Sequence, residues 1–577
     1  MTSPYLITMY HCANTERASS NGRSQCLEAA PNVCKGCFLV QYCGKDCQRA
    51  HWNVHKSDCK SSLIKASWKP SWDVENRQPA FIAGDDTPFL HHTSHGRQKY
   101  LWGNVPALDL IKLQQNEGVN FGGDLRLLLA ASGDIRNIVK SLIGLPETYA
   151  GHCEVVVNDK DSDIVARNAI LLLIALYFSP EEATPMILHM WYSALVPAQM
   201  LGSLRDNILP LIQEVCNKIQ AKPAQSLLSK TWTYGTRSLR LILTKEHWNH
   251  LLPYFEIPDG LSAVQAQVIR LSTTLAPERK DYLERALLSQ PPAWRVCTMK
   301  FRKDGILLPF GSSRQEHDSP NPTLYQTTTS WPMLDSADPL EGWPTDEIFD
   351  KAPPAKNDMY GSLFFYLQDL LGLFCRRMGR LRVSIQLSQV DARKLPSIIK
   401  RDGMDQCLFD RIEVSNITDR GYLGPGITLD TFGPLLKRKT QNPNATIVAL
   451  FLNAMHEAHS PLDLLKSTRS TMERIRSYIP IDRDMVQAST GNKANLVRFL
   501  SAEVLFRDFD AIFNRFKREC HLDEISKAAG LTMKSENTIV RPWPMRLRNN
   551  ATQREFDVRL ASGHTGSEHY VEWKSAV

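Results

Sequence analysis

The chain has 577 residues, of which 43% are hydrophobic and 22% charged, a globular composition with enough length for more than one domain. Its net charge of +7 is small for this length and is not concentrated, so we expect no direct binding of nucleic acid. The longest apolar run, residues 169–178, is much shorter than the roughly 20 residues that cross a bilayer, so we expect no membrane anchor.

Cysteine is concentrated at the start of the chain. Seven of the 13 cysteines lie in the first 59 residues, and a histidine stands among them. The spacing is C-x13-C-x7-C-x2-C-x5-C-x3-C-x7-H-x3-C. Thiolate and imidazole are the ligands that tetrahedral Zn²⁺ prefers, and eight of them complete two closed, structural sites. The candidate ligands are Cys12, Cys26, Cys34, Cys37, Cys43, Cys47, His55 and Cys59.

Disulfides are the main alternative use for clustered cysteines. The first residues, MTSPYLITMYH, contain no basic region followed by a long apolar run, so the sequence predicts no secretory signal. We therefore expect an intracellular protein, in the nucleus or the cytoplasm, whose thiols hold zinc. His51 lies four residues from Cys47 and from His55 and competes as a ligand, but we expect it at the surface.

The segment resembles the MYND zinc finger. The motifs that carry the resemblance are CKGC, YCGKDCQ, Trp52 and HKSDC. The resemblance implies two zinc ions with interleaved ligands, and it implies a module that binds short proline-containing peptides of partner proteins, with Gln48 and Trp52 beside the groove. The family usually opens with CxxC, whereas thirteen residues separate Cys12 from Cys26 here. The implied ligand sets are Cys12, Cys26, Cys43 and Cys47 for one ion, and Cys34, Cys37, His55 and Cys59 for the other.

The body begins near residue 100, after a connecting segment rich in Ser, Pro, Asp and His. Apolar runs predict strands at 125–130 and 153–157, and helical spacing predicts helices at 135–143 and 163–178. This alternation predicts an α/β fold with a mainly parallel sheet.

The first of these units offers a candidate cofactor site. Gly133 follows the first strand and Asp159 ends the second. At these two places S-adenosylmethionine-dependent methyltransferases hold their cofactor, by backbone N–H groups of the glycine turn and by an acid that bonds the ribose hydroxyls. The loop has one glycine, however, and Asp134 places a negative charge at the helix entrance. A plain turn glycine and a helix-capping aspartate are the alternative interpretation, which we favour, so we expect a degenerate methyltransferase-like body without tight cofactor binding.

A second resemblance covers roughly residues 100–178. The segments LRLLLAASGDIRNIVKSL and VVVNDKDSDIVARNAILLL resemble the domain of unknown function of dynein axonemal assembly factor three, which accompanies MYND fingers in fungal proteins. The later segments RKDGILLPFG and FDRIEVSNITD also resemble such fungal proteins. The resemblance implies a methyltransferase-like fold and no established reaction.

The remaining chain alternates between helical and strand-like stretches. Residues 185–290 read as mostly helical, and strands are predicted at 381–387, 407–416 and 445–452. The tail reads as helical from 460 to 527 and irregular beyond. The predicted organisation is a finger (12–59), a linker (60–98), a first half of the body (99–200), a mostly helical insertion with a Pro-rich stretch (201–360), a second half of the sheet (361–460), and a helical C-terminal region and tail (461–577).

Three functions remain open. The sequence favours an adaptor or regulator that acts through protein–protein interaction by its finger. A methyltransferase that uses S-adenosylmethionine is the second, although no SET-type motif is present, and a transcriptional co-regulator is the third. An enzyme is the less favoured interpretation, and no catalytic residue is proposed.

Overall fold

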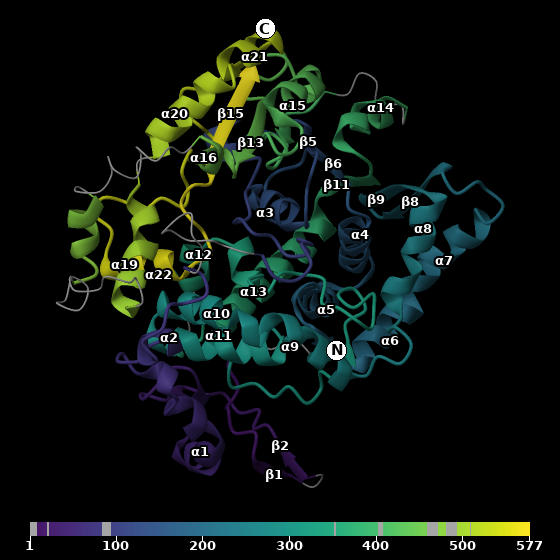
Figure 1. The fold of residues 1–577 in the computed structure, drawn as a ribbon. Coiled ribbons are helices and arrows are strands. Elements are labelled where there is room, and N and C mark those ends of the chain that lie inside the picture. The colour runs from purple at the N-terminus through teal and green to yellow at the C-terminus, as the bar shows by residue number, and fades with distance from the viewer. Residues whose placement is uncertain are drawn as a thin grey trace.

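A computed structural model describes residues 9–19, 22–82, 94–350, 354–401, 408–458, 471–480, 493–507 and 509–577. Within these ranges a small N-terminal finger lies against one side of a large α/β body (Figure 1). The strand predicted at 407–416 and the helical tail predicted at 460–527 lie partly outside the described residues. No helix in the described ranges combines the length and apolarity needed to cross a membrane.

The body is built on a mixed, mostly parallel sheet of nine strands, which confirms the predicted α/β class. Six neighbouring strands, from β13 to β9, run parallel, while β15 and β8 run antiparallel to their neighbours. In spatial order the strands are β14 (Leu531–Met533), β15 (His569–Ser575), β13 (Thr446–Phe451), β12 (Arg411–Glu413), β5 (Leu125–Leu129), β6 (His152–Asp159), β11 (Arg382–Gln389), β9 (Arg237–Thr244) and β8 (Leu227–Tyr234).

Helices cover both faces of the sheet. In β5 the side chains of Leu127 and Leu129 enter one core, while Leu128 between them enters the other, as the alternation of a strand requires. The helices of the first core are α3 (Arg136–Gly144), α4 (Ser162–Tyr177), α5 (Pro180–Tyr192) and α13 (Met359–Arg380). Those of the second, in the upper part of Figure 1, are α14 (Leu395–Ile399), α15 (Gly424–Phe432), α20 (Phe509–Glu519) and α21 (Leu522–Ala528).

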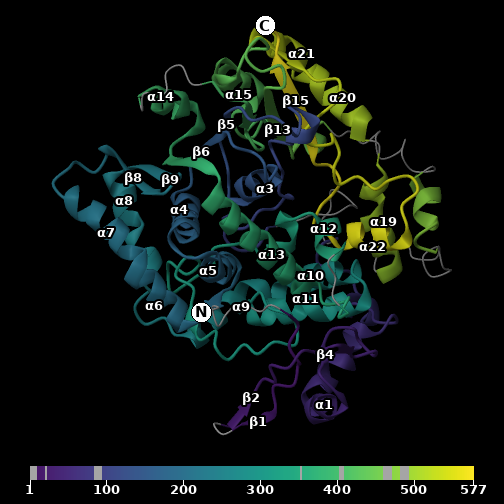
Figure 2. The same cartoon turned by 180° about the vertical axis from the view of Figure 1, so that it is seen from behind.

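Further helices extend the first layer, seen from behind in Figure 2. The short strands β7 (Leu195–Val196) and β10 (Ser319–Pro320) pair with each other beside them. The helices are α6 (Ala198–Asn207), α7 (Leu209–Lys218), α8 (Lys245–His250), α9 (Ala263–Thr274), α10 (Lys280–Leu288), α11 (Pro292–Asp304), α12 (Thr345–Asp350), α19 (Ala494–Glu503) and α22 (Gln553–Ala561). The short helix α16 (Ala454–Glu457) packs in the second core, on α20.

Four strands of the sheet were missed by the sequence analysis. The hairpin β8–β9 lies in the stretch interpreted as mostly helical, and β8 is an edge strand with mostly polar, exposed residues. Strands β14 and β15 lie in the tail interpreted as irregular. In β15 a charged residue, Glu572, occupies a buried position and interrupts the apolar pattern of the strand. The carboxylate can be buried because it accepts hydrogen bonds from the backbone of Thr538, Ile539 and Val540.

The finger comprises short strands and one helix. Residues 60–82, which were expected to be a linker, carry the turn Ser62–Ile64 and the helix α2 (Ser71–Val74) and pack on α10 and α11. The elements of the finger are β1 (Arg17–Ser19), β2 (Gly22–Ser24), β3 (Asn32–Val33), β4 (Gln41–Tyr42) and α1 (Lys45–Cys59).

Candidate metal centre

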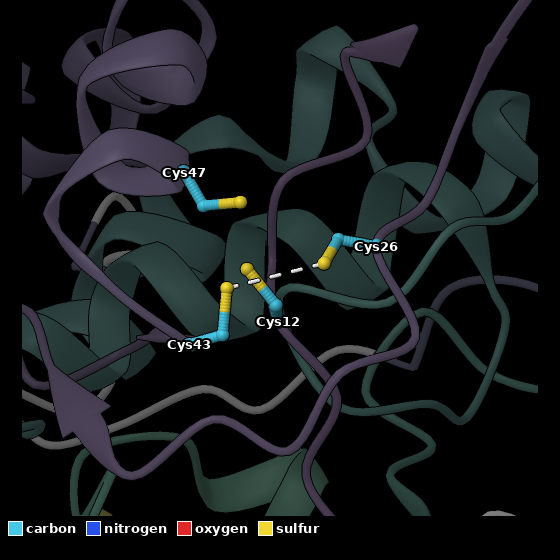
Figure 3. A group of neighbouring side chains, drawn as sticks. All are labelled: Cys12, Cys26, Cys43 and Cys47. Carbon is cyan, nitrogen blue, oxygen red and sulfur yellow. Dashed lines mark hydrogen bonds between the residues drawn. The ribbon is translucent and has the colours of Figure 1, made fainter. Parts of the chain in front are cut away.

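The first group of donor atoms joins the extended start of the chain to helix α1. The thiols of Cys12, Cys26, Cys43 and Cys47 all lie within 4.8 Å of one another. Figure 3 shows the four sulfurs pointing toward a common centre, with Cys47 on the helix and Cys43 just before it. The Sγ atoms of Cys26 and Cys43 are 4.0 Å apart.

The second group joins the CKGC turn to the other end of α1. Its donors come from Cys34, Cys37, His55 and Cys59, again within 4.8 Å of one another. Cys34 and Cys59 have their sulfurs 3.9 Å apart, and Cys37 Sγ lies 3.4 Å from His55 Nε2. The two groups therefore interleave along the chain as the resemblance implied.

These spacings fit tetrahedral zinc. With Zn–S bonds of about 2.3 Å and Zn–N bonds of about 2.0 Å, tetrahedral geometry separates two sulfurs by about 3.8 Å and a sulfur from a nitrogen by about 3.5 Å. The observed sulfur distances of 4.0 and 3.9 Å and the sulfur–nitrogen distance of 3.4 Å lie close to these values. Each group has four donors and no further protein ligand is needed, so both are closed sites of the structural kind.

The electrostatics of the second group also favours a cation. Hydrogen bonds from Cys37 and His55 lower the pKa of Cys34 to about 3, while the same contact with Cys34 is the main cause that raises the pKa of Cys37. The opposite shifts arise because the negative charge of one sulfur is stabilised by protons on its neighbours. A divalent cation stabilises all the donors of a group together, which removes this competition.

Local backbone and side-chain contacts hold the donors in place. Gly36 allows the CKGC turn to pass the second group, because a Cβ atom there would lie 3.0 Å from the sulfur of Cys59. The backbone N–H of Leu39 donates to Cys37 Sγ over 3.4 Å, and Arg17 donates to Cys26 Sγ over 3.1 Å.

His51 belongs to neither group, and the surface position expected for it is wrong. The side chain is buried, and its Nδ1 atom lies 3.0 Å from the hydroxyl of Tyr42. Burial lowers the pKa of His51 to about 4, so the ring stays neutral and serves to fix α1 against β4. The four-residue spacing made His51 a competing ligand, because it lies on the same face of α1 as His55. Only His55 is close enough to join a metal group.

The finger is joined to the body along its inner side. Asn357 donates to the carbonyl of Cys37 over 2.8 Å, and Gln41 accepts from the backbone of Ala355 over 3.0 Å. Gly311 of the body approaches the finger so closely that a Cβ atom would lie 2.6 Å from that of Ala13. Sequence reasoning missed these contacts, because residues more than 250 positions apart meet there and no local pattern announces them.

The candidate cofactor loop after β5 is closed by its own hydrogen bonds. Gly133 has φ of +56°, a conformation that suits glycine, and its N–H donates to Asp159 over 2.9 Å. The other oxygen of Asp159 accepts from the backbone of Asp161 over 2.9 Å, and Asn168 donates to the carbonyl of Gly133 over 2.7 Å. Both oxygens of the acid that could hold a ribose are thus engaged by the chain itself.

The segment before β5 fills the mouth of this loop. Asp134, buried, accepts from Gly103 over 2.8 Å and forms an ion pair of 2.6 Å with Arg136. A side chain at Gly103 would collide with that guanidinium. The small pocket that remains beside Asp134 and Arg167 has no room for a water molecule, so it cannot hold a nucleoside.

Comparison with protein families assigns two parts of the chain. Residues 24–59 match the MYND finger. The N-terminal segment is a MYND zinc finger. Residues 101–196 match the domain of unknown function DUF4470, and the two matches together cover less than half of the chain. No curated protein and no solved structure matches this chain. The MYND finger, a protein-interaction module with two zinc sites, therefore carries the function that can be assigned, and Cys12 lies outside its matched range.

Proposed function

We propose that the protein acts as an adaptor or regulator, in which the MYND finger binds a proline-containing peptide of a partner protein. The observation that carries this proposal is the two-sided finger. Its inner side is bonded to the body, while α1 lies on the outer side, away from the sheet (Figure 1).

The outer face of α1 offers an aromatic anchor. Trp52 is only partly buried, and the amino group of Lys60 lies 5.8 Å from its ring centroid. Gln48, one turn earlier on the same face, is also partly buried and has an amide that can bond a peptide backbone. A flat ring beside a polar amide suits a proline ring and the carbonyl that precedes it.

The metal sites serve this surface by fixing α1. We assign Cys12, Cys26, Cys43 and Cys47 to one zinc ion, and Cys34, Cys37, His55 and Cys59 to the other. When bound, zinc supplies no reaction here; it joins both ends of α1 to the strands and turns of the finger.

For the body we propose a methyltransferase-like sheet that has lost cofactor binding. If the hairpin β8–β9 is left aside, its strands numbered along the chain stand in the order 3-2-1-4-5-7-6, with the seventh antiparallel. This is the strand order of S-adenosylmethionine-dependent methyltransferases. The engaged Asp159 and the covered Gly133 loop support loss of the cofactor. The segment LRLLLAASGDIRNIVKSL supports kinship with the dynein axonemal assembly factor domain.

Calorimetry with a proline-rich peptide tests the adaptor proposal. Trp52→Ala should weaken binding by about tenfold or more, because truncating an aromatic anchor costs about 1–2 kcal/mol or more. Val54→Ala is the matched control, since Val54 is exposed on the opposite side of α1 and should leave the affinity unchanged. Equal binding by wild type and Trp52→Ala would overturn the assignment of the groove.

Calorimetry with S-adenosylmethionine tests the alternative, that the body is an enzyme. We expect no tight binding. Saturable binding of wild type in the micromolar range, lost in Asp159→Ala, would replace the adaptor proposal with a methyltransferase.

A further inference from the structure

A pocket beside the segment that covers the candidate cofactor loop is formed by residues far apart in the chain. It is open to solvent on one side, and the space between its lining residues, counted out to the open mouth, is about 460 Å³. Figures 1 and 2 both show α12 and α22 side by side where it lies. Its walls come from α11, the turn Pro339–Gly342, α12, the start of α13 and the end of α22.

One wall of this pocket is apolar and aromatic. Trp294 and Phe349 stack with their ring centroids 4.9 Å apart and an angle of 21° between the planes. Leu340, Met359 and Val558 continue the wall. Such a surface accepts hydrocarbon chains and, through the ring faces, a positive charge.

The other wall carries acids. Asp338 and Glu341 line the pocket, and Asp338 already accepts from the hydroxyl of Tyr360 over 2.7 Å. The carboxylate of Glu341 has no hydrogen-bond donor among the described residues, and it lies so close to Gly563 that a Cβ atom there would be 1.9 Å from Glu341 Oε1. Gly563 is exposed to solvent, which places the rim of the pocket beside this carboxylate.

Two buried polar atoms in the lining also lack a partner. Nε2 of His564 and Oγ1 of Thr345 make no hydrogen bond within the described part of the chain, although both residues are more than nine-tenths buried. Just behind them, Oε2 of the buried Glu568 is unpartnered as well. Unsatisfied buried groups of this kind are costly, and a bound ligand is one means of satisfying them.

We propose that this pocket binds a small organic cation, an amine or guanidine, whose charged group bonds Glu341 and whose hydrocarbon part lies on Trp294 and Phe349. A metal ion is the wrong ligand, because within the described ranges only the two finger groups bring three or more donor atoms into metal-binding reach. The two acids on one wall disfavour an anion.

The charges around Glu341 favour a bound cation. Burial, followed by Asp338 and Glu568, raises the pKa of Glu341 well above its ordinary value, and Arg302 opposes this only in part. Arg302 is already engaged, since it donates to the carbonyls of Thr274 and Asp335. A bound cation favours the ionised form of Glu341, so binding near neutral pH should release a proton.

Calorimetry on the full-length, zinc-loaded chain tests the proposal, with agmatine and 1,5-diaminopentane as probes and 1,5-pentanediol as the neutral isostere. We expect saturable binding of the amines and none of the diol. Repeating the titration in buffers of different ionisation enthalpy should reveal proton release. Absence of saturable amine binding, or equal binding of the diol, overturns the proposal.

Variants locate the site. Glu341→Gln should weaken amine binding by about 10- to 100-fold and abolish proton release, as expected for loss of a charged hydrogen bond. Gly563→Ala should also weaken binding, because it displaces the Glu341 carboxylate without removing its charge. Glu536→Gln, which neutralises an exposed acid elsewhere, is the control and should bind as wild type does. Melting temperatures check that each variant is folded, and unchanged affinity in folded Glu341→Gln refutes the site.

Discussion

The finger and the body of this protein are held together by different means. The finger places eight donor atoms in two groups within 48 residues, and metal binding supplies most of its folding free energy because so short a segment buries little surface. The body has a nine-stranded sheet between two layers of helices and is stabilised by apolar burial. One chain thus contains two parts stabilised in different ways, one sensitive to loss of metal and the other to loss of apolar packing.

The two parts are not independent, because they share a surface. Leu39 and Val40 of the finger belong to the same buried cluster as the first core of the body, and Tyr10 packs against Phe365 with ring centroids 4.6 Å apart. Loss of the finger would therefore expose apolar surface on the body as well.

Removal of zinc should have the largest effect. We expect two zinc ions per chain by elemental analysis, and apparent binding free energies on the order of 10–16 kcal/mol for a structural zinc site. A strong chelator should unfold the finger while circular dichroism of the body changes little. Cys37→Ser should lose the second ion, and a wild-type stoichiometry near one would remove Cys12 from the ligand set.

A cavity in the body should have the reverse pattern: it should destabilise the body and leave the metal sites of the finger intact. Leu387 on β11 is fully buried in the first core, so Leu387→Ala should lower the free energy of unfolding by about 2–5 kcal/mol. Urea denaturation measures the loss, and the zinc content should stay at two. Val268→Ala, at an exposed position of α9, is the control and should change stability by less than about 0.5 kcal/mol.

The body should also respond to pH through Glu413. Burial raises the pKa of this carboxyl, at the end of β12, to about 7, and its Oε2 atom has no partner within the described residues. The folded pKa lies above the unfolded value, so the stability it contributes is complete below about pH 4.5 and is lost as the pH rises toward 7.

Comparison with Glu413→Gln isolates this contribution. Between pH 4.5 and 7.5 the wild type should lose on the order of 3 kcal/mol relative to the variant, measured by urea denaturation at each pH. Parallel pH profiles of the two proteins would show that Glu413 does not titrate in this range.

The smallest effect should come from the junction. Asn357→Ala removes the donor to the carbonyl of Cys37, a loss of about 1–3 kcal/mol if that carbonyl stays unpaired. We expect faster transfer of zinc from the finger to a chromophoric chelator, with little change in the melting of the body. Asn53→Ala, on the exposed face of α1, is the control, and equal release rates would mean that finger and body are uncoupled.

The finger could be predicted from sequence much more fully than the body. Its donors lie close together along the chain, so their spacing carries the geometry, and the zinc chemistry follows from the residue types. In the body, apolar runs revealed β5, β6, β11 and β13, which are buried on both faces. Edge strand β8 and the charged β15 gave no such signal, and the contact of Asn357 with the finger depends on tertiary packing.

The place of β15 between β13 and β14 has a consequence for how the protein is made. Leu450 of β13 pairs with Tyr570 of β15, 570 − 450 = 120 residues later. At about 5–20 residues per second, the ribosome needs roughly 6–24 s to supply that partner. During this time the apolar edge of β13 (TIVALF) has no strand to cover it, which is the kind of segment that aggregates. Newly made chains should therefore depend on chaperones that hold this edge until β15 arrives.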